Sequence, residues 1–136
     1  MTDICRMQKE DIDIDAILSS TTNETDGAQI VFVGRVRDDG LEGLEIEADV
    51  SQAEKDLRTI SDDAKKRFSV SAVHIIHRFG SLSVGEVIIV TVVCSSHRKE
   101  GYEASEYVID KIKEFVPIWK QEVLAGGKKG DWVEVH

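Results

Sequence analysis

Residues 86–95 form an almost wholly apolar segment, and this segment most constrains what the chain can fold into. A strand that is apolar on both faces is typical of the centre of a sheet covered on both sides. A long helical pattern follows at residues 101–116, and Pro117, the only proline in the chain, is expected to end that helix. A central strand that leads into a long helix predicts an α/β or α+β fold.

Shorter patterns predict the remaining strands and loops. Alternation of apolar and polar residues predicts strands at residues 4–8, 28–37, 44–49, 71–78 and 131–135. We expect the strand at 28–37 to have one strongly buried face and the strand at 44–49 to be half exposed. Polar or glycine-rich segments predict a turn region at 80–85 and surface loops at 19–27 and 126–130.

Two further helices complete the expected fold. Residues 52–68 carry apolar side chains at helical spacing, with Ser51 as the expected N-cap and Glu54 as its partner in a capping box. A brief helix is expected near residues 14–19. The whole chain, residues 1–136, is therefore expected to form a single domain with a mixed sheet and two main helices.

Bulk properties argue against several classes of protein. The longest apolar stretch, residues 87–94, is too short to span a bilayer, and the N-terminus has no basic segment followed by a long apolar one. No membrane contact and no signal peptide is expected, so the expected location is cytoplasmic. The net charge of −9 at pH 7 argues against non-specific binding of nucleic acid.

The motifs predict no metal site and no bound cofactor. Cys5 and Cys94 lie far apart in sequence, and two thiols alone do not make a zinc site. Cys94 ends the apolar strand, which favours a small core residue. His74 and His77 point to opposite faces of their strand, which makes them poor partners for one metal. The chain contains no Walker loop, GxSxG or HExxH motif.

The junction between the apolar strand and the long helix is a candidate anion site. A helix start offers backbone N–H groups and a positive dipole end. His97 and Arg98 add donors there, and an arginine can hold a phosphate with two parallel hydrogen bonds. The alternative is that Ser96 caps the helix while the basic residues face solvent. The residues alone favour neither interpretation.

The long helix carries a lysine between two contrasting stripes. The apolar stripe consists of Ala104, Val108, Ile112 and Phe115, and the acidic, exposed stripe consists of Glu103, Glu106, Asp110 and Glu114. Lys113 lies on a further face, with Tyr102, Ile109 and Val116. A lysine among apolar groups can be partly desolvated, which makes its amine a better nucleophile or base. Spacing alone favours the alternative, a subunit-interface lysine that keeps its amine in water.

Two more places present cationic side chains. Trp119 and Lys120 follow the long helix, and Lys120 either binds an anion or pairs with Glu122. Arg35 and Arg37 lie at the end of the strand at 28–37, where sites at sheet ends commonly collect ligand contacts.

Taken together, the motifs resemble the large, catalytic subunit family of molybdopterin synthase. The matching residues span 27–133 in the family's order and are Gly27, Ala28, Phe32, Gly34, Val36, Arg37, Leu44, Glu45, Glu47, Ala48, Ala53, Glu54, Lys55, His77, Arg78, Gly80, Leu82, Gly85, Glu86, Ser96, His97, Arg98, Ala104, Asp110, Lys113, Pro117, Ile118, Trp119, Lys120, Glu122, Trp132 and Val133. His-Arg, then Lys, then Pro-Ile-Trp-Lys at this spacing is the specific part of the match.

The resemblance implies a fold, a reaction and partners. The fold is an α/β hammerhead. The enzyme is a sulfurtransferase that moves sulfur from the thiocarboxylated C-terminus of a ubiquitin-like small subunit to cyclic pyranopterin monophosphate. Two transfers form the dithiolene of molybdopterin, the precursor of the molybdenum cofactor. The family works as a homodimer of large subunits with one small subunit at each end, a heterotetramer.

The resemblance also implies roles for particular residues. Lys113 matches the family's essential lysine and Lys120 a second active-site lysine, so both are expected to be catalytic. The expected substrate-binding residues are Arg35, Val36, Arg37, His97, Arg98, Lys113, Lys120, Gln121 and Glu122. Two roles stay open for Lys113: it acts either as a base or as a nucleophile that accepts the acyl group.

The chain departs from the family pattern at four positions, and three other functions compete with the synthase. Ile46 and Asp49 replace frequent tyrosines, Gln52 a methionine and Gln121 a common lysine. One alternative is a non-catalytic docking module for a ubiquitin-like protein, against which the two lysines argue. The others are a phosphoryl-handling enzyme, which would lack a phosphate loop, and a thiol-dependent sulfurtransferase that uses Cys94.

Overall fold

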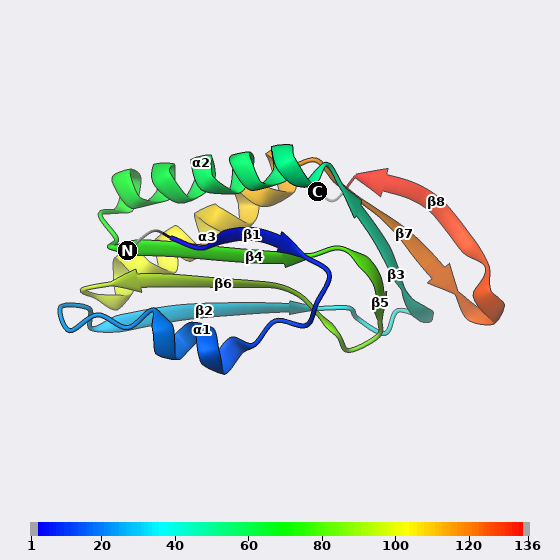
Figure 1. Ribbon diagram of the computed structural model, residues 1–136, viewed down its shortest axis with the longest axis horizontal. Helices are drawn as coiled ribbons and strands as arrows, with labels where there is room; N and C mark the ends of the chain where they lie inside the picture. The colour runs from blue at the N-terminus through cyan, green and yellow to red at the C-terminus, as the bar shows by residue number, and fades with distance from the viewer. Residues whose placement is uncertain (1–2, 135–136) are drawn as a thin grey trace.

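The computed structural model describes residues 3–134, which form two four-stranded β-sheets and three α-helices (Figure 1). In chain order the elements are β1 (Cys5–Gln8), α1 (Ile14–Ser20), β2 (Ala28–Arg35), β3 (Leu41–Ala48), α2 (Val50–Phe68), β4 (Ala72–Arg78), β5 (Gly80–Ser83), β6 (Val87–Ser95), α3 (Arg98–Phe115), β7 (Ile118–Leu124), the 3-10 turn η1 (Ala125–Gly127) and β8 (Lys129–Glu134). The predicted α/β class with two main helices is confirmed.

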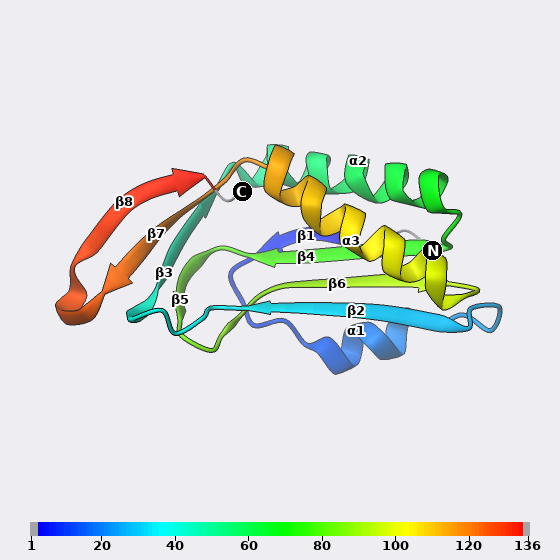
Figure 2. The same ribbon diagram turned by 180° about the vertical axis from the view of Figure 1, so that it is seen from behind.

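The first sheet has the strand order β1-β4-β6-β2 and is mixed, because β1 runs parallel to β4 while the other pairs are antiparallel. Helices α2 and α3 cover one face and α1 covers the other (Figures 1 and 2). Strand β6 lies between β4 and β2 and is buried from Val90 to its end. The predicted central strand is therefore confirmed.

The second sheet has the order β5-β3-β7-β8, is wholly antiparallel and extends from one end of the first (Figure 2). Its strand β5 occupies residues 80–83 of the predicted turn region at 80–85, so that prediction is wrong in part. Leu82 pairs with Leu44 and both are buried, which makes the segment a strand. A four-residue strand with one apolar side chain carries too little periodicity to be recognised.

Strand β2 does not have the strongly buried face that its alternation predicts. It is the outer strand of the first sheet, and Val31 and Phe32 are 37% and 40% exposed. Ile30 and Gly34 are half-buried, so only part of the predicted face is covered. The strand also ends at Arg35 rather than at the predicted residue 37. Alternation predicts the two faces of a strand but not whether an edge position leaves them open.

Both main helices begin differently from the prediction. The N-cap of α2 is Asp49, whose carboxylate accepts from Gln52 N at 3.2 Å, so the predicted cap Ser51 lies inside the helix. Glu54 serves another purpose, because its carboxylate accepts from Met7 N at 3.0 Å and holds β1. The N-cap of α3 is His97 and not Ser96.

The faces of α3 agree with the prediction except at the last turn. Ala104, Val108 and Ile112 are buried, but Phe115 is 62% exposed. Phe115 is the last residue of the helix, and Lys111 Nζ lies 5.1 Å from the centroid of its ring. At 18 residues α3 is one residue shorter than α2.

The C-terminal segment is more regular than expected. The predicted loop at 126–130 contains η1 and the start of β8, and the predicted strand at 131–135 begins at Lys129. Val135 lies outside the described residues. Over residues 3–134, no helix combines the length and the hydropathy needed to cross a membrane.

Candidate functional site

The start of α3 presents His97 and Arg98 at the surface. Ser95 Oγ donates to the His97 carbonyl at 2.5 Å, while the His97 side chain makes no capping bond. Glycine allows the close packing here, since a Cβ at Gly101 would lie 2.7 Å from Ile30 Cγ1. A shallow pocket of about 450 Å³ opens at this place, lined by Gly27, Ala28, Ser96, His97, Arg98 and Lys99. Helix-start N–H groups beside His97 and Arg98 suit an anion.

The end of β2 presents the two predicted arginines on either side of a buried valine. Arg35 Nη1 donates to the Gly85 carbonyl at 2.9 Å. Val36 is 3% exposed, and its N–H and carbonyl are bonded to Glu86 O at 3.0 Å and Gly85 N at 2.8 Å. Both backbone groups of Val36 therefore bond the turn that precedes β6. Arg37 is exposed and lies 3.5 Å from Asp39, a surface pair that leaves the guanidinium accessible.

Strand β7 divides its three predicted residues between two faces. Lys120 pairs with Ile46, and because directly opposed residues share a face, Lys120 lies on the inner face with buried Ile46. Glu122 shares that face. Gln121 lies on the opposite face, and its amide donates to the Gly130 carbonyl at 2.9 Å. A ligand beside Lys120 can meet Glu122 more readily than the side chain of Gln121.

Lys113 lies in the last turn of α3 and is exposed in the chain. The C-terminal ends of α3 and β2 and the start of β7 all lie toward the second sheet (Figure 2). We call Arg35, Arg37, Lys113 and Lys120 the hinge-end group, and His97 and Arg98 the helix-start group.

One chain does not bring these two groups together. Arg98 and Lys113 are 15 residues apart on one helix, which is about 22 Å along its axis at roughly 1.5 Å per residue. Strand β2 gives the same separation, since Ala28 pairs with Ser95 at one end and Arg35 with Val87 at the other. Seven residues of strand span about 23 Å. The helix-start and hinge-end groups therefore lie at opposite ends of the first sheet.

The buried histidines and cysteines have structural roles. His74 Nδ1 accepts from Ile4 N at 3.0 Å, and His77 Nδ1 lies 2.7 Å from the Arg78 carbonyl oxygen. Burial lowers the pKa of both, that of His77 to about 4. Cys94 is 1% exposed, which confirms the predicted core role, and burial raises the pKa of its thiol. Burial thus disfavours the thiolate that a Cys94-dependent mechanism would need.

A surface role of Phe32 and Tyr102 is not evident from the sequence pattern. With Ile109 they line an apolar pocket of about 340 Å³ between β2 and α3, and Tyr102 is 62% exposed. The alternation of the strand predicts Phe32 as a core residue, and only the edge position of β2 reveals its exposure. In the part of the chain from 3 to 134, no group of three or more His, Cys, Asp or Glu side chains could hold a metal ion.

The fold and the exposed basic residues define an α/β protein with cationic side chains at its surface. The sequence matches the MoaE protein family over residues 7–115. The chain therefore belongs to the MoaE family, as its motifs predict.

Relatives and solved structures agree with this assignment. A molybdopterin synthase catalytic subunit from Staphylococcus aureus (strain Mu50 / ATCC 700699) is 42% identical over 113 residues, covering 80% of this chain and 76% of that protein. The crystal structure of molybdopterin synthase from Staphylococcus aureus matches with a TM-score of 0.89 at 36% identity and covers 98% of both chains. A chain in the complex of subunits 1 and 2 of the molybdopterin-converting factor from Helicobacter pylori 26695 matches at 0.77 with 25% identity, covering 92% of this chain and 87% of that one.

Proposed function

We propose that this chain is the catalytic subunit of molybdopterin synthase. It transfers sulfur from the thiocarboxylated C-terminus of a ubiquitin-like small subunit to cyclic pyranopterin monophosphate and so forms the dithiolene of molybdopterin. The observation that carries the proposal is that this MoaE-family chain presents Arg37, His97, Arg98 and Lys113 at its surface, and its motif resemblance implies that these are site residues. The similar chain within a two-subunit complex supports the small subunit as partner.

The two cationic groups form one site when two copies of the chain associate. In a two-fold dimer with β2 and α3 antiparallel to their counterparts, the hinge-end group of one copy faces the helix-start group of the other. The unpaired edge of β2 within residues 3–134 and the exposed Phe32 and Tyr102 support this face as the contact. Each dimer then has two sites and binds one small subunit at each end, as a heterotetramer.

The cations and the lysines have separate tasks in this site. Arg37, with His97 and Arg98 of the other copy, holds the substrate phosphate and neutralises charge that develops during transfer. Lys113 and Lys120 act on the acyl group or on a proton. In each transfer the thiocarboxylate sulfur forms a bond to a substrate carbon and displaces an oxygen substituent there. Water or a lysine amine then takes the acyl group, which breaks the acyl–sulfur bond, releases the carrier from the sulfur and leaves a thiol on the substrate. The compartment we infer is the cytoplasm, which the two unpaired cysteines support.

Reconstitution tests the proposal directly. The purified chain is mixed with thiocarboxylated small subunit and cyclic pyranopterin monophosphate, and dithiolene formation is followed. Wild-type protein is expected to make product, and Lys113→Ala is expected to lose at least about 100-fold in kcat with a smaller change in KM. Near-normal turnover with only a raised KM would contradict the chemical role of Lys113. Tight binding of the small subunit without product would favour the docking module instead.

A further inference from the structure

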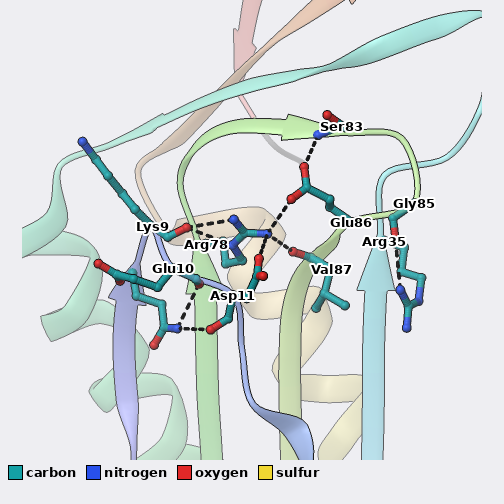
Figure 3. Close-up of polar contacts among 10 residues, drawn as sticks. Lys9, Glu10, Asp11, Arg35, Arg78, Ser83, Gly85, Glu86 and Val87 are labelled. Carbon is teal, nitrogen blue, oxygen red and sulfur yellow. Dashed lines mark hydrogen bonds and ion pairs between the residues drawn. The ribbon is translucent and has the colours of Figure 1, made fainter.

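A buried arginine joins three segments where the first sheet meets the second. Arg78 ends β4 and is 6% exposed. Its guanidinium donates to the Lys9 carbonyl from Nη2 at 2.8 Å and from Nε at 3.1 Å, and to the Val87 carbonyl at 3.3 Å (Figure 3). The carboxylates of Asp11 and Glu86 lie 3.4 and 3.5 Å from Nη1 and balance its charge. A cation this well bonded defines the local geometry of all three segments.

Glu86 connects Arg78 to the turn between β5 and β6. One carboxylate oxygen pairs with Arg78 and the other accepts from Ser83 N (Figure 3). Glu86 N donates to the Ser83 carbonyl at 3.0 Å, and Gly85 has a φ of +90°, which favours glycine at this position of the turn. The hydrogen bond from Ser83, reinforced by the nearby Arg78, lowers the pKa of Glu86. The ionised carboxylate thus holds the turn closed.

The same turn holds the arginines at the end of β2. The Gly85 carbonyl accepts from Arg35 Nη1, and Gly85 N and Glu86 O bond both backbone groups of Val36. Arg37 comes next in the chain, and its exposed side chain lies 3.5 Å from Asp39. The direction in which Arg37 leaves the sheet is therefore set through the turn.

We propose that Glu86, fixed by Arg78, is a positioning residue that directs Arg37 toward the substrate anion. The inference depends on the proposed function, because it concerns the ligand of that same site. Glu86 does not itself contact the ligand. Misplacement of a binding group by about 1 Å costs as much as 100-fold in enzymes, so loss of the Glu86 carboxylate has a measurable effect on substrate binding.

Kinetics of three variants test the role of the carboxylate. Glu86→Ala is expected to raise the KM for cyclic pyranopterin monophosphate roughly tenfold while kcat changes less than about threefold. Glu86→Gln keeps an oxygen that accepts from Ser83 N and is expected to recover most of the affinity. Asp11→Ala is the matched control, because Asp11 pairs with the same guanidinium but does not touch the turn, and its KM is expected to stay within about twofold of the wild type. An unchanged KM in folded, active Glu86→Ala protein overturns the proposal.

A double-mutant cycle and hydrogen exchange separate positioning from general damage. In the Arg37→Ala background, Glu86→Ala is expected to add little further increase in KM, whereas independent effects would multiply. Amide exchange at residues 35–37 of the protein without substrate is expected to accelerate in Glu86→Ala and not in Asp11→Ala. Multiplying effects, or unchanged exchange at 35–37, would each overturn the proposal. If the wild type makes no product, the proposed function fails, while exchange still decides whether Glu86 holds this segment.

Discussion

At the scale of single residues, the first sheet contains titratable groups whose roles are structural. His77 is 3% exposed, and burial lowers its pKa from 6.5 to about 4, so the imidazole is neutral in the folded protein at pH 7. Its Nδ1 lies 2.7 Å from the Arg78 carbonyl oxygen. Burial removes water from the ring and so disfavours the charged imidazolium, and the hydrogen bond with the Arg78 carbonyl offsets only part of this effect.

Stability is therefore expected to fall as the pH is lowered below about 6.5. Between pH 6.5 and about 4 the unfolded chain binds a proton at His77 that the folded chain does not, so the free energy of unfolding decreases with falling pH over this window. The expected loss between pH 7.5 and pH 5 is about 2 kcal/mol. Urea unfolding at both pH values measures it. The His77→Gln variant is expected to lose clearly less free energy of unfolding over this pH range, and His74 is expected to account for the remaining loss. An equal loss in the variant and the wild type would exclude His77 as the source.

At the scale of secondary-structure elements, periodicity predicts the helices and the central strand well because each buries a continuous face. It predicts edges and ends less well. Ser51 satisfies a capping pattern, yet Asp49 two residues earlier is the cap, because Val50 also joins the helix. Apolar and polar residues alternate along β2 as in a strand with one buried face. However, β2 lies at the edge of its sheet, and no strand within residues 3–134 pairs with its outer side. Cap choice and strand order depend on tertiary contacts that local spacing does not encode.

Asp49 is also one of the positions at which the chain departs from the family pattern, and its cap role predicts a cost of removal. Asp49→Ala is expected to lower the free energy of unfolding by about 1 kcal/mol, because Gln52 N loses its acceptor. Ser51→Ala, inside the first turn, is expected to change it by less than about 0.5 kcal/mol. Thermal or urea unfolding of the two variants measures the difference. A larger effect at Ser51 would restore the capping box that the sequence pattern predicts.

At the scale of the whole molecule, motif spacing identifies the cationic residues but not how they meet. Arg98 and Lys113 belong to one helix, so their separation of about 22 Å follows from the helical rise alone. What the sequence does not contain is the second copy that would bring Lys113 near another Arg98. The inner position of Lys120 and the outer position of Gln121 likewise depend on the register of β7 against β3.

A site shared between two copies predicts complementation between inactive variants. Lys113→Ala and Arg98→Ala are each expected to lose activity alone. In a mixed dimer, one site combines Lys113 of the Arg98→Ala copy with Arg98 of the Lys113→Ala copy and is intact, while the other site carries both changes. Random exchange at equal concentrations makes half of the dimers mixed, so about one quarter of the wild-type activity is expected. Product formation after co-refolding measures it.

The same mixture gives a different result if each site lies within one chain. Every site then carries one of the two substitutions, and no mixing restores activity. Phe32→Asp adds a second test, because a charge on the apolar face between β2 and α3 is expected to weaken the dimer and reduce complementation together. A dimer and complementation that both persist in the Phe32→Asp background would place the contact between copies elsewhere. Loss of both the dimer and complementation would instead indicate that the catalytic site depends on contact between copies at the unpaired edge of β2.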